Sequence, residues 1–387
     1  MATARFSVIM PTFNRADTIK RAIDSVLGQT FGDFELLITD DGSTDGTAEL
    51  VRNIDPRIKV FVQENQGIGG ARNTAMRNST GQHIAFLDSD DEWLPHHLAM
   101  GHAFFETHPA EHLFSGEFWS DFGGGYVEKH FLLSMGEWFP RMADTIGCGS
   151  LRLPPGEIDG YLRFYSSRSP LLAWGRDVLQ GTPYLDGAFH YRGHIFEGWR
   201  WGWIMAAQNT IVSRTVLDSI GLLEDQKYPI ASDFPWLARA CQRYEAHMVS
   251  APSCIKHEHG IGGARMGEEH LATGRTKRQF AKDLLRAHEE LFWNAHREDP
   301  ELTALRGYCQ LFLARTALAQ GDRPEALAAL REAAKSYPGW EARALLQILR
   351  AVPGTLVPSR LFAALEIAAR LSSRTRNRLV RRGQAHA

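Results

Sequence analysis

Several features that would place this chain in a familiar class are missing from its sequence. The 387 residues include four cysteines, none spaced as Cys-x-x-Cys, which excludes a zinc ribbon or a disulfide scaffold and favours reduced thiols. The net charge of −2 offers no overall attraction for nucleic acid. No apolar run approaches the roughly 20 residues of a bilayer-spanning helix, and Pro11 ends the first run too early for a signal peptide. We therefore expect a cytoplasmic globular protein that binds no nucleic acid.

Two common nucleotide-binding motifs are also missing. The first expected strand is followed by "PTFNR" at residues 11–15, where a dinucleotide-binding fold would carry Gly-x-Gly-x-x-Gly. Gly67, Gly69 and Gly70 follow a later strand and have a different spacing, and the chain has no P-loop sequence. These absences exclude an ordinary dinucleotide-dependent oxidoreductase and a P-loop NTPase.

The first ninety residues alternate short apolar runs with amphipathic segments. Such alternation predicts β-α-β units on a parallel sheet. The expected strands are 6–10, 34–38, 58–62 and 83–87, and the expected helices are 17–27, 43–54 and 69–78.

Each of the expected strands runs into a polar segment. These segments read "PTFNR", "TDDGSTD", "ENQGIGGARN" and "DSDDEW". Because ligands of parallel sheets bind at the carboxyl ends of the strands, this edge is predicted to hold a binding site.

The residue types in these segments fit a nucleotide and a cation. In extended geometry Asp88 and Asp90 point the same way, and paired carboxylates suit Mg²⁺ or Mn²⁺. The alternative is an acidic turn that caps the next helix. Asp40 could accept a hydrogen bond from a base ring, and Arg72 could reach a diphosphate with its fork of donors.

The middle of the chain is less regular. Residues 113–119 and 126–132 flank three glycines and predict a hairpin, and 237–244 predicts a helix. A histidine-rich helix at 95–108 has spacings that do not favour metal binding. Trp199, Trp201 and Trp203 alternate as on a strand, and their face would either contact an acceptor sugar or be buried against other helices.

Beyond about Glu269 the composition changes to the Ala, Leu, Arg and Glu typical of helices. Residues 313–338 match the spacing of one tetratricopeptide repeat without a second copy, which favours a plain helical appendage. From Arg370 onwards there are six arginines and no acid. This tail would either contact an anionic membrane surface, which would place the protein peripherally at the inner face, or remain disordered.

The segments "SVIMPTFNR", "TDDGSTDGT", "NQGIGGARN" and "AFLDSDDEW", taken together in this order and spacing, resemble family 2 glycosyltransferases. The resemblance is strong over 5–100 and extends to about 260. It implies a GT-A fold, an α/β fold with a Rossmann-like, mostly parallel sheet flanked by helices. We expect this domain at 1–265, with a nucleotide-binding half at 1–100 and an acceptor half at 101–265. A helical C-terminal region with a basic tail would follow at 266–387.

The resemblance also implies roles for single residues. Thr12 and Phe13 would border the nucleoside, Asp40 would bind the base, Arg72 would approach the diphosphate and Asp88 the ribose. Asp90 would bind the metal, and Asp91 would support it. The remaining nucleotide-binding positions implied are Pro11, Asn14, Arg15, Gly67 and Ser89.

Two further positions match the family's pattern later in the domain. Asp233, in "YPIASDFPWLARA", occupies the place of the general base, although the family often has Glu-Asp where this chain has Ser232-Asp233. The alternative role for Asp233 is a helix cap. Some members add a histidine to the metal, and His257 is the first candidate, ahead of His259.

The sequence therefore predicts a metal-dependent inverting glycosyltransferase that uses Mn²⁺ or Mg²⁺. The donor would be a nucleotide sugar, with UDP as the default nucleotide. The acceptor would be a hydroxyl of a glycan or a lipid-linked sugar in surface polysaccharide synthesis. The alternatives are a non-catalytic scaffold that binds sugar nucleotides or partner proteins, and a nucleotidyltransferase.

Overall fold

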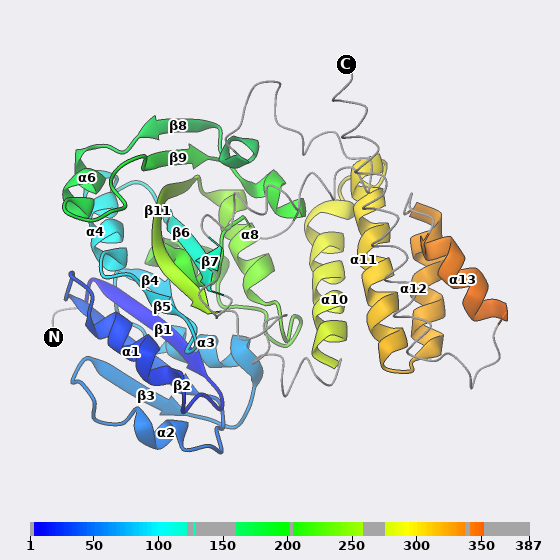
Figure 1. Cartoon of the computed structure of the whole chain (residues 1–387), viewed down its shortest axis with the longest axis horizontal. Helices are drawn as coiled ribbons and strands as arrows, with labels where there is room; N and C mark the ends of the chain where they lie inside the picture. Colours follow the sequence, from blue (N-terminus) through cyan, green and yellow to red (C-terminus); the bar gives the residue numbers. More distant parts are fainter. Residues whose placement is uncertain are drawn as a thin grey trace.

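A computed structural model describes residues 4–121, 127–128, 160–201, 204–257, 275–336 and 341–351. One mixed sheet dominates this part of the chain (Figure 1). Its main path, in spatial order, is β3 (Ile58–Val62), β2 (Phe34–Asp40), β1 (Phe6–Thr12), β4 (His83–Phe86), β10 (Thr210–Ser213), β6 (Leu113–Asp121), β11 (Ala246–His257), β9 (Phe189–Gly193) and β8 (Ser167–Pro170). Two short strands lie off this path, β5 (Glu92–Trp93) on β11 and β7 (Val127–Glu128) on β6.

Most long strands of the sheet run in one direction. Strands β3, β2, β1 and β4 pair in parallel, and β6 pairs in parallel with β11. Strand β10 is antiparallel to both β4 and β6, so it joins the two parallel groups without changing their common direction. The predicted α/β class with a mostly parallel sheet is confirmed, and so are the four strands expected in the first ninety residues.

The sheet has an apolar core on each face. Val8 and Met10 of β1 pack in one core, whereas Ile9 between them packs in the other, as the alternation of side chains requires. Helices α1 (Ile19–Leu27) and α4 (His97–Thr107) contribute to the Val8 core, together with α6 (Ala173–Leu179). Helices α3 (Gly67–Arg77), α7 (Arg214–Ile220) and α8 (Asp233–Arg243) contribute to the Ile9 core.

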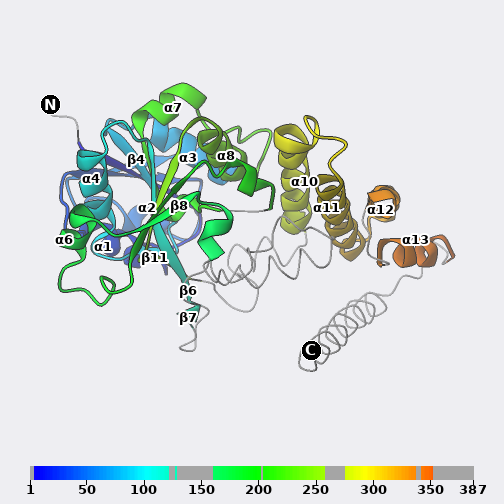
Figure 2. The same cartoon turned by 90° about the horizontal axis from the view of Figure 1, so that it is seen from above.

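Further helices lie near the C-terminus, as the composition predicted. They are α10 (Arg275–His288), a π-helical turn at Glu289–Trp293, α11 (Pro300–Ala319), α12 (Arg323–Ser336) and α13 (Glu341–Ala351). Figures 1 and 2 show α10 between the α/β part and the other helices. Helices α11 and α12 pack against each other, with Leu330 and Ala333 in their shared core. Ala326 is buried as well, and all three are small or large positions of the repeat-like segment. The predicted helical appendage is confirmed.

Some local expectations were wrong. The first part of the tryptophan segment is a 3₁₀ helix at Phe196–Trp201 rather than a strand, and the ring of Trp199 in it is buried in the core. The helix expected over 43–54 is only α2 (Thr47–Leu50). It starts late because Asp40 and Asp45 accept the backbone N–H groups of Ser43 and Thr47, which keeps the preceding residues in a loop. The remaining short elements are 3₁₀ turns at Gly160–Arg163 and Ala207–Asn209. The predicted hairpin is confirmed where β6 meets β7.

Candidate active site

The loops after β1 and β2 are tied together at the carboxyl edge of the sheet. Asn14, in a left-handed conformation with φ of 51°, donates its backbone N–H to Ser43 Oγ, and its side-chain Oδ1 accepts the backbone N–H of Thr44. The backbone N–H of Arg15 donates to Thr47 Oγ1. Asn tolerates this backbone region better than most residues. The predicted nucleotide-binding residues 14 and 15 are therefore held against the loop that follows Asp40.

Asp40 ends β2 and is fully buried. Its Oδ1 accepts the backbone N–H groups of Gly42 and Ser43, at 3.1 and 2.7 Å. Its Oδ2 is buried and has no hydrogen-bond partner in the part of the chain that the structure describes. A buried carboxylate oxygen normally has a partner, so this atom marks a place where a ligand can supply a donor.

The neighbouring Asp41 is a residue whose role the sequence reasoning missed. It is buried and accepts the side-chain N–H of Gln63 and the backbone N–H groups of Gln66 and Gly67, at 2.7–2.9 Å. Gly67 has φ of +82°, which only glycine adopts without strain. Asp41 therefore shapes the turn that leads into α3, where Gly67 and Arg72 lie. The only sequence signal for it was its place beside Asp40.

Arg72 connects two carboxylates that are far apart in the sequence. Its buried guanidinium donates from Nη2 to Asp88 Oδ1 at 2.7 Å, and Nη1 lies 4.0 Å from Asp233 Oδ2. Burial raises the pKa of Asp233, the charge of Arg72 opposes this, and the charge of Asp88 adds to it. Asp233 keeps 21% of its side chain exposed, so a substrate can reach it. It begins α8, which is also consistent with the helix-start alternative.

The acidic segment after β4 has one buried and two partly exposed carboxylates. Asp91 is buried and accepts the backbone N–H of His257, whereas the side chains of Asp88 and Asp90 are 26% and 22% exposed. Burial raises the pKa of Asp91 well above its ordinary value, and the charges of Asp90 and Asp88 raise it further. Arg15 Nε lies 3.4 Å from Asp90 Oδ2. This concentration of carboxylate oxygens fits a hard divalent cation. Such a cation would offset the repulsion between the neighbouring carboxylates.

His257, at the end of β11, has a carboxylate on each side of its ring. Nε2 lies 3.3 Å from Glu92 Oε1, and Nδ1 lies 3.2 Å from Asp121 Oδ2. The hydrogen bond from His257 is the main cause that lowers the pKa of Glu92. The metal role of His257 stays a prediction, because binding a cation would require the ring to give up one of these neighbours. His259 lies outside the described residues.

The other predicted positions are placed as follows. Pro11 and Thr12 are buried at the end of β1, and Thr12 Oγ1 has no hydrogen-bond partner among the residues that the structure describes. Phe13 is half-buried, and Ser89 is buried beside Asp88.

Of the three tryptophans, the structure describes the side chain of Trp199 alone. Trp199 has no exposed surface and packs edge-on against Phe234 in the core, so it offers no face to a sugar in this structure. Of the two alternatives for this segment, contact with an acceptor sugar or burial, Trp199 agrees with burial. The side chain of Trp201 and all of Trp203 lie outside the described part of the chain.

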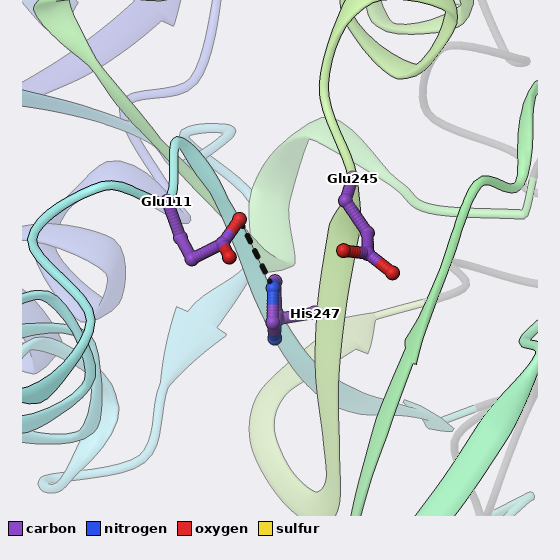
Figure 3. Close-up of side chains that lie close together, drawn as sticks. All are labelled: Glu111, Glu245 and His247. Atoms are coloured by element: carbon purple, nitrogen blue, oxygen red, sulfur yellow. Dashed lines mark ion pairs between the residues drawn. The ribbon is translucent and has the colours of Figure 1, made fainter.

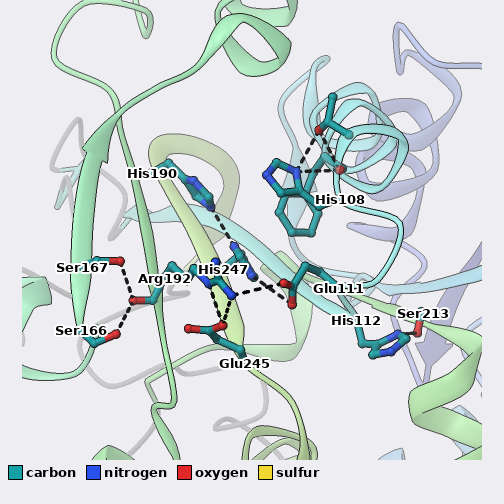
Figure 4. A network of polar contacts seen from close by, with 12 residues as sticks. His108, Glu111, His112, Ser166, Ser167, His190, Arg192, Ser213, Glu245 and His247 are labelled. Carbon is teal, nitrogen blue, oxygen red and sulfur yellow. Dashed lines mark hydrogen bonds and ion pairs between the residues drawn. The ribbon is translucent and has the colours of Figure 1, made fainter.

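Glu111, Glu245 and His247 form a second polar cluster, far from the edge described above. Their ligand atoms lie within 4.8 Å of one another, the only such group of three found in the described residues (Figure 3). Glu111 and Glu245 precede β6 and β11, which places them at the opposite edge of the sheet from Asp40 and Asp88. Arg192 pairs with both glutamates, and His190 bonds to His247 at 3.0 Å (Figure 4). A guanidinium already neutralises the acids, so we interpret this cluster as a structural network.

The histidines of α4 also have structural partners. His97 is buried and stacks on Trp93, and His102 stacks on Phe31. His96 bonds to the carbonyl of Pro252.

Comparison with known proteins finds similarity over about the first third of the chain. Residues 7–144 match the family model described as Glycosyl transferase family 2. The Escherichia coli protein named UDP-Glc:alpha-D-GlcNAc-diphosphoundecaprenol beta-1,3-glucosyltransferase WfgD is 47% identical over 96 residues, 24% of this chain and 38% of that protein. The Campylobacter jejuni protein named GalNAc(5)-diNAcBac-PP-undecaprenol beta-1,3-glucosyltransferase is 42% identical over 95 residues, 23% of this chain and 31% of that protein. The chain thus spans about a third of the length of these curated relatives.

Among solved structures, S. aureus TarS 1-349 in complex with UDP aligns with a TM-score of 0.46 and 17% identity, over 89% of this chain and 91% of that chain. None of the helices in the described ranges is long and apolar enough to cross a membrane.

Proposed function

We propose that the chain is a metal-dependent inverting glycosyltransferase with a nucleotide-sugar donor, because residues 7–144 match the family model described as Glycosyl transferase family 2. The observation that carries this proposal is the position of Arg72. It bonds to Asp88 of the donor motif and lies 4.0 Å from Asp233, the candidate base. If these residues have the proposed roles, donor-binding and acceptor-activating groups lie at one edge of the sheet.

The donor nucleotide would bind along the loops after β1 and β2. The free Oδ2 of Asp40 accepts hydrogen bonds and donates none when ionised, so it suits a base with a ring N–H, such as uracil. Cytosine has an acceptor at the same position. UDP is therefore the expected nucleotide, and the similar nucleotide CDP should bind more weakly.

The cation would be held by Asp90, with Asp91 behind it and His257 as the further candidate ligand. Mg²⁺ and Mn²⁺ commonly share their coordination with substrate phosphates, which suits a site with few protein ligands. When bound, the cation neutralises charge that develops on the leaving nucleoside diphosphate. Arg72 would add a fixed positive charge from the protein side.

Asp233 would act as the general base. Its carboxylate takes the proton of the acceptor hydroxyl as the oxygen attacks the anomeric carbon, and the bond from that carbon to the diphosphate breaks. A single displacement from the opposite face inverts the anomeric configuration. The raised pKa of Asp233 makes it a stronger base than an ordinary carboxylate.

The acceptor is proposed to be a lipid-linked sugar or another glycan hydroxyl in surface polysaccharide synthesis. The support comes from the names of the relatives, two of which refer to a diphosphoundecaprenol-linked or PP-undecaprenol-linked acceptor. Peripheral contact with a membrane through the basic tail would bring the enzyme to such an acceptor. The tail itself lies outside the described residues.

The experiment that tests this function measures UDP release from four donors, UDP-glucose, UDP-galactose and their N-acetylated counterparts, each with Mn²⁺. A synthetic GlcNAc diphosphate on a short lipid is added as acceptor in parallel reactions. We expect one donor to release UDP at least about tenfold faster with acceptor, and EDTA to abolish this. Nucleotide binding without turnover of any donor by the folded protein would instead favour the scaffold alternative.

A further inference from the structure

The loop Leu223–Ser232, which leads into Asp233, is held by the first C-terminal helix. Asp283 of α10 is fully buried, and its Oδ2 accepts the backbone N–H groups of Ile230 and Ala231, at 2.8 and 3.1 Å. Its Oδ1 accepts the side-chain N–H of Gln279 at 2.7 Å. A residue 50 positions beyond Asp233 in the sequence thus fixes the two backbone groups that lie just before it.

Other groups near the end of α10 fasten the same loop. Glu290 accepts the hydroxyl of Tyr228 at 2.9 Å and pairs with Lys227, and Arg286 donates to the carbonyl of Lys227. His288 stacks on Phe234, the residue after Asp233, with ring centroids 5.3 Å apart.

The opposite side of the loop contacts the donor-side helix α3. Asn73 donates to the carbonyl of Leu223 at 2.9 Å and accepts the backbone N–H of the same residue at 3.0 Å. A Cβ on Gly69 would lie 2.6 Å from Ser232 Oγ and 2.8 Å from Asp225 Cβ, so glycine is what permits this close approach. The loop therefore lies between α3, which carries Arg72, and α10.

We propose that Asp283 is a positioning residue that sets the place of the Asp233 carboxylate relative to Arg72. This inference rests on the proposed function, because it assigns the loop a catalytic purpose. It also assigns α10 to the working transferase, whereas the sequence placed the end of that domain at residue 265.

The physical argument concerns two buried N–H groups. Without the Asp283 carboxylate the backbone groups of Ile230 and Ala231 lose their acceptor, and the loop must shift to find another. A shift of about 1 Å at a reacting group can lower the rate about a hundredfold. The donor contacts of Asp40 and Arg72 come from other elements and should not change.

The test compares Asp283→Ala, Asp283→Asn and Lys282→Ala in the full chain. Asparagine keeps an oxygen acceptor for the backbone N–H groups of the loop. Asp283→Asn should therefore retain most of the loop protection and turnover that Asp283→Ala loses. Lys282 directly precedes Asp283 on α10, but it pairs with Glu325 of α12 rather than with the loop. Lys282→Ala is therefore the matched control. Thermal melting checks that each variant is folded.

Two measurements are made on each variant. Hydrogen–deuterium exchange with UDP and Mn²⁺ present follows peptides covering 223–232, and steady-state kinetics follow UDP release from the donor that the screen identifies. In Asp283→Ala we expect exchange of this peptide to be at least about tenfold faster and kcat to fall about tenfold to a hundredfold, with the donor KM within about threefold of the wild type. In Asp283→Asn the exchange rate, kcat and the donor KM should stay within about threefold of the wild type. Lys282→Ala should match the wild type in all three.

An unchanged exchange rate for the 223–232 peptide in Asp283→Ala, or an equal loss of kcat in Lys282→Ala, would overturn the inference. A failure of the proposed function gives a different result. In that case Asp233→Asn retains its turnover, or no variant including the wild type turns over any donor, although the exchange data still report on the loop.

Discussion

Replacing Asp233 with asparagine is expected to lower kcat about a thousandfold and to leave UDP affinity within about threefold of the wild type. Asparagine has nearly the same shape, but it cannot take a proton from the acceptor hydroxyl. The nucleotide contacts proposed for Asp40 and Arg72 do not involve the proton-accepting function of Asp233. The loss should therefore fall on turnover and not on donor binding. The measurement is steady-state UDP release, with calorimetry for the affinity.

The pH dependence of turnover is a second test of the role predicted for Asp233. A base acts only when it is deprotonated, so the wild-type rate should rise with pH through the pKa of Asp233. Because burial raises that pKa, the rise should occur above the range of an ordinary carboxyl group. The residual rate of the asparagine variant should lack this rise. The matched control is Asp218→Asn, an exposed carboxylate on α7. A kcat of Asp233→Asn within threefold of the wild type would exclude Asp233 as the base.

The second large effect concerns stability in acid. Burial lowers the pKa of His83 and His97 to about 3 and that of His190 and His247 to about 4. In the unfolded chain these groups titrate near 6.5, so between pH 6.5 and 4 the unfolded state binds more protons than the native state. The free energy of unfolding must then fall as the pH decreases through this window. Below the folded pKa values this loss is complete.

The size of this effect follows from the number of histidines. Each unit of pKa depression corresponds to about 1.4 kcal/mol, and even half of the combined depression would amount to roughly 8 kcal/mol. That is comparable to the total stability of a typical domain, about 5–15 kcal/mol. We therefore expect cooperative unfolding between about pH 4 and 6, a window that begins near the pKa of ordinary carboxylates and extends above it.

The measurement is thermal or urea unfolding from pH 7.5 to 4. His247→Gln removes one of the depressed groups, so its stability should fall less steeply with acidification than that of the wild type. His296→Gln, an exposed histidine before α11, is the control and should reproduce the wild-type slope. A melting temperature that does not change between pH 7 and 5 would contradict the prediction.

Local patterns were sufficient to predict the strands of the first ninety residues. Strands β1 to β4 could be located because each is a short apolar run between turn residues, and their carboxyl ends meet because the strands are parallel. For the same reason Asp40, Arg72 and Asp88 could be expected at one edge. The contact of Arg72 with Asp88 and its approach to Asp233 agree with that expectation.

The rest depends on contacts between residues distant in the sequence. Trp199 alternates with other tryptophans as on a strand, yet it is a core residue of a 3₁₀ helix, and only the surrounding helices decide this. Asp283 looks like an ordinary acid on an amphipathic helix. Its burial and its bonds to Ile230 and Ala231 appear only when α10 is packed on the loop before α8. No local pattern carries that information.

The central claim is that the carboxyl edge of the sheet binds a nucleoside diphosphate together with a divalent cation. The most direct measurement is isothermal titration of UDP and CDP into the purified protein, with Mn²⁺ and with EDTA. The variants are Asp90→Ala, Asp40→Ala and, as a control, Asp24→Ala, an exposed carboxylate on α1. UDP and CDP differ at the base edge, so their comparison tests the contact proposed between Asp40 and the base.

We predict that UDP binds the wild type in the presence of Mn²⁺ and that EDTA or Asp90→Ala weakens this binding at least about tenfold, which is about 1.4 kcal/mol. CDP should bind more weakly than UDP, and Asp40→Ala should remove the difference between them. Asp24→Ala should behave as the wild type. Equal binding of UDP with Mn²⁺ and with EDTA, unchanged in Asp90→Ala, would contradict the account, as would a folded protein that binds neither nucleotide.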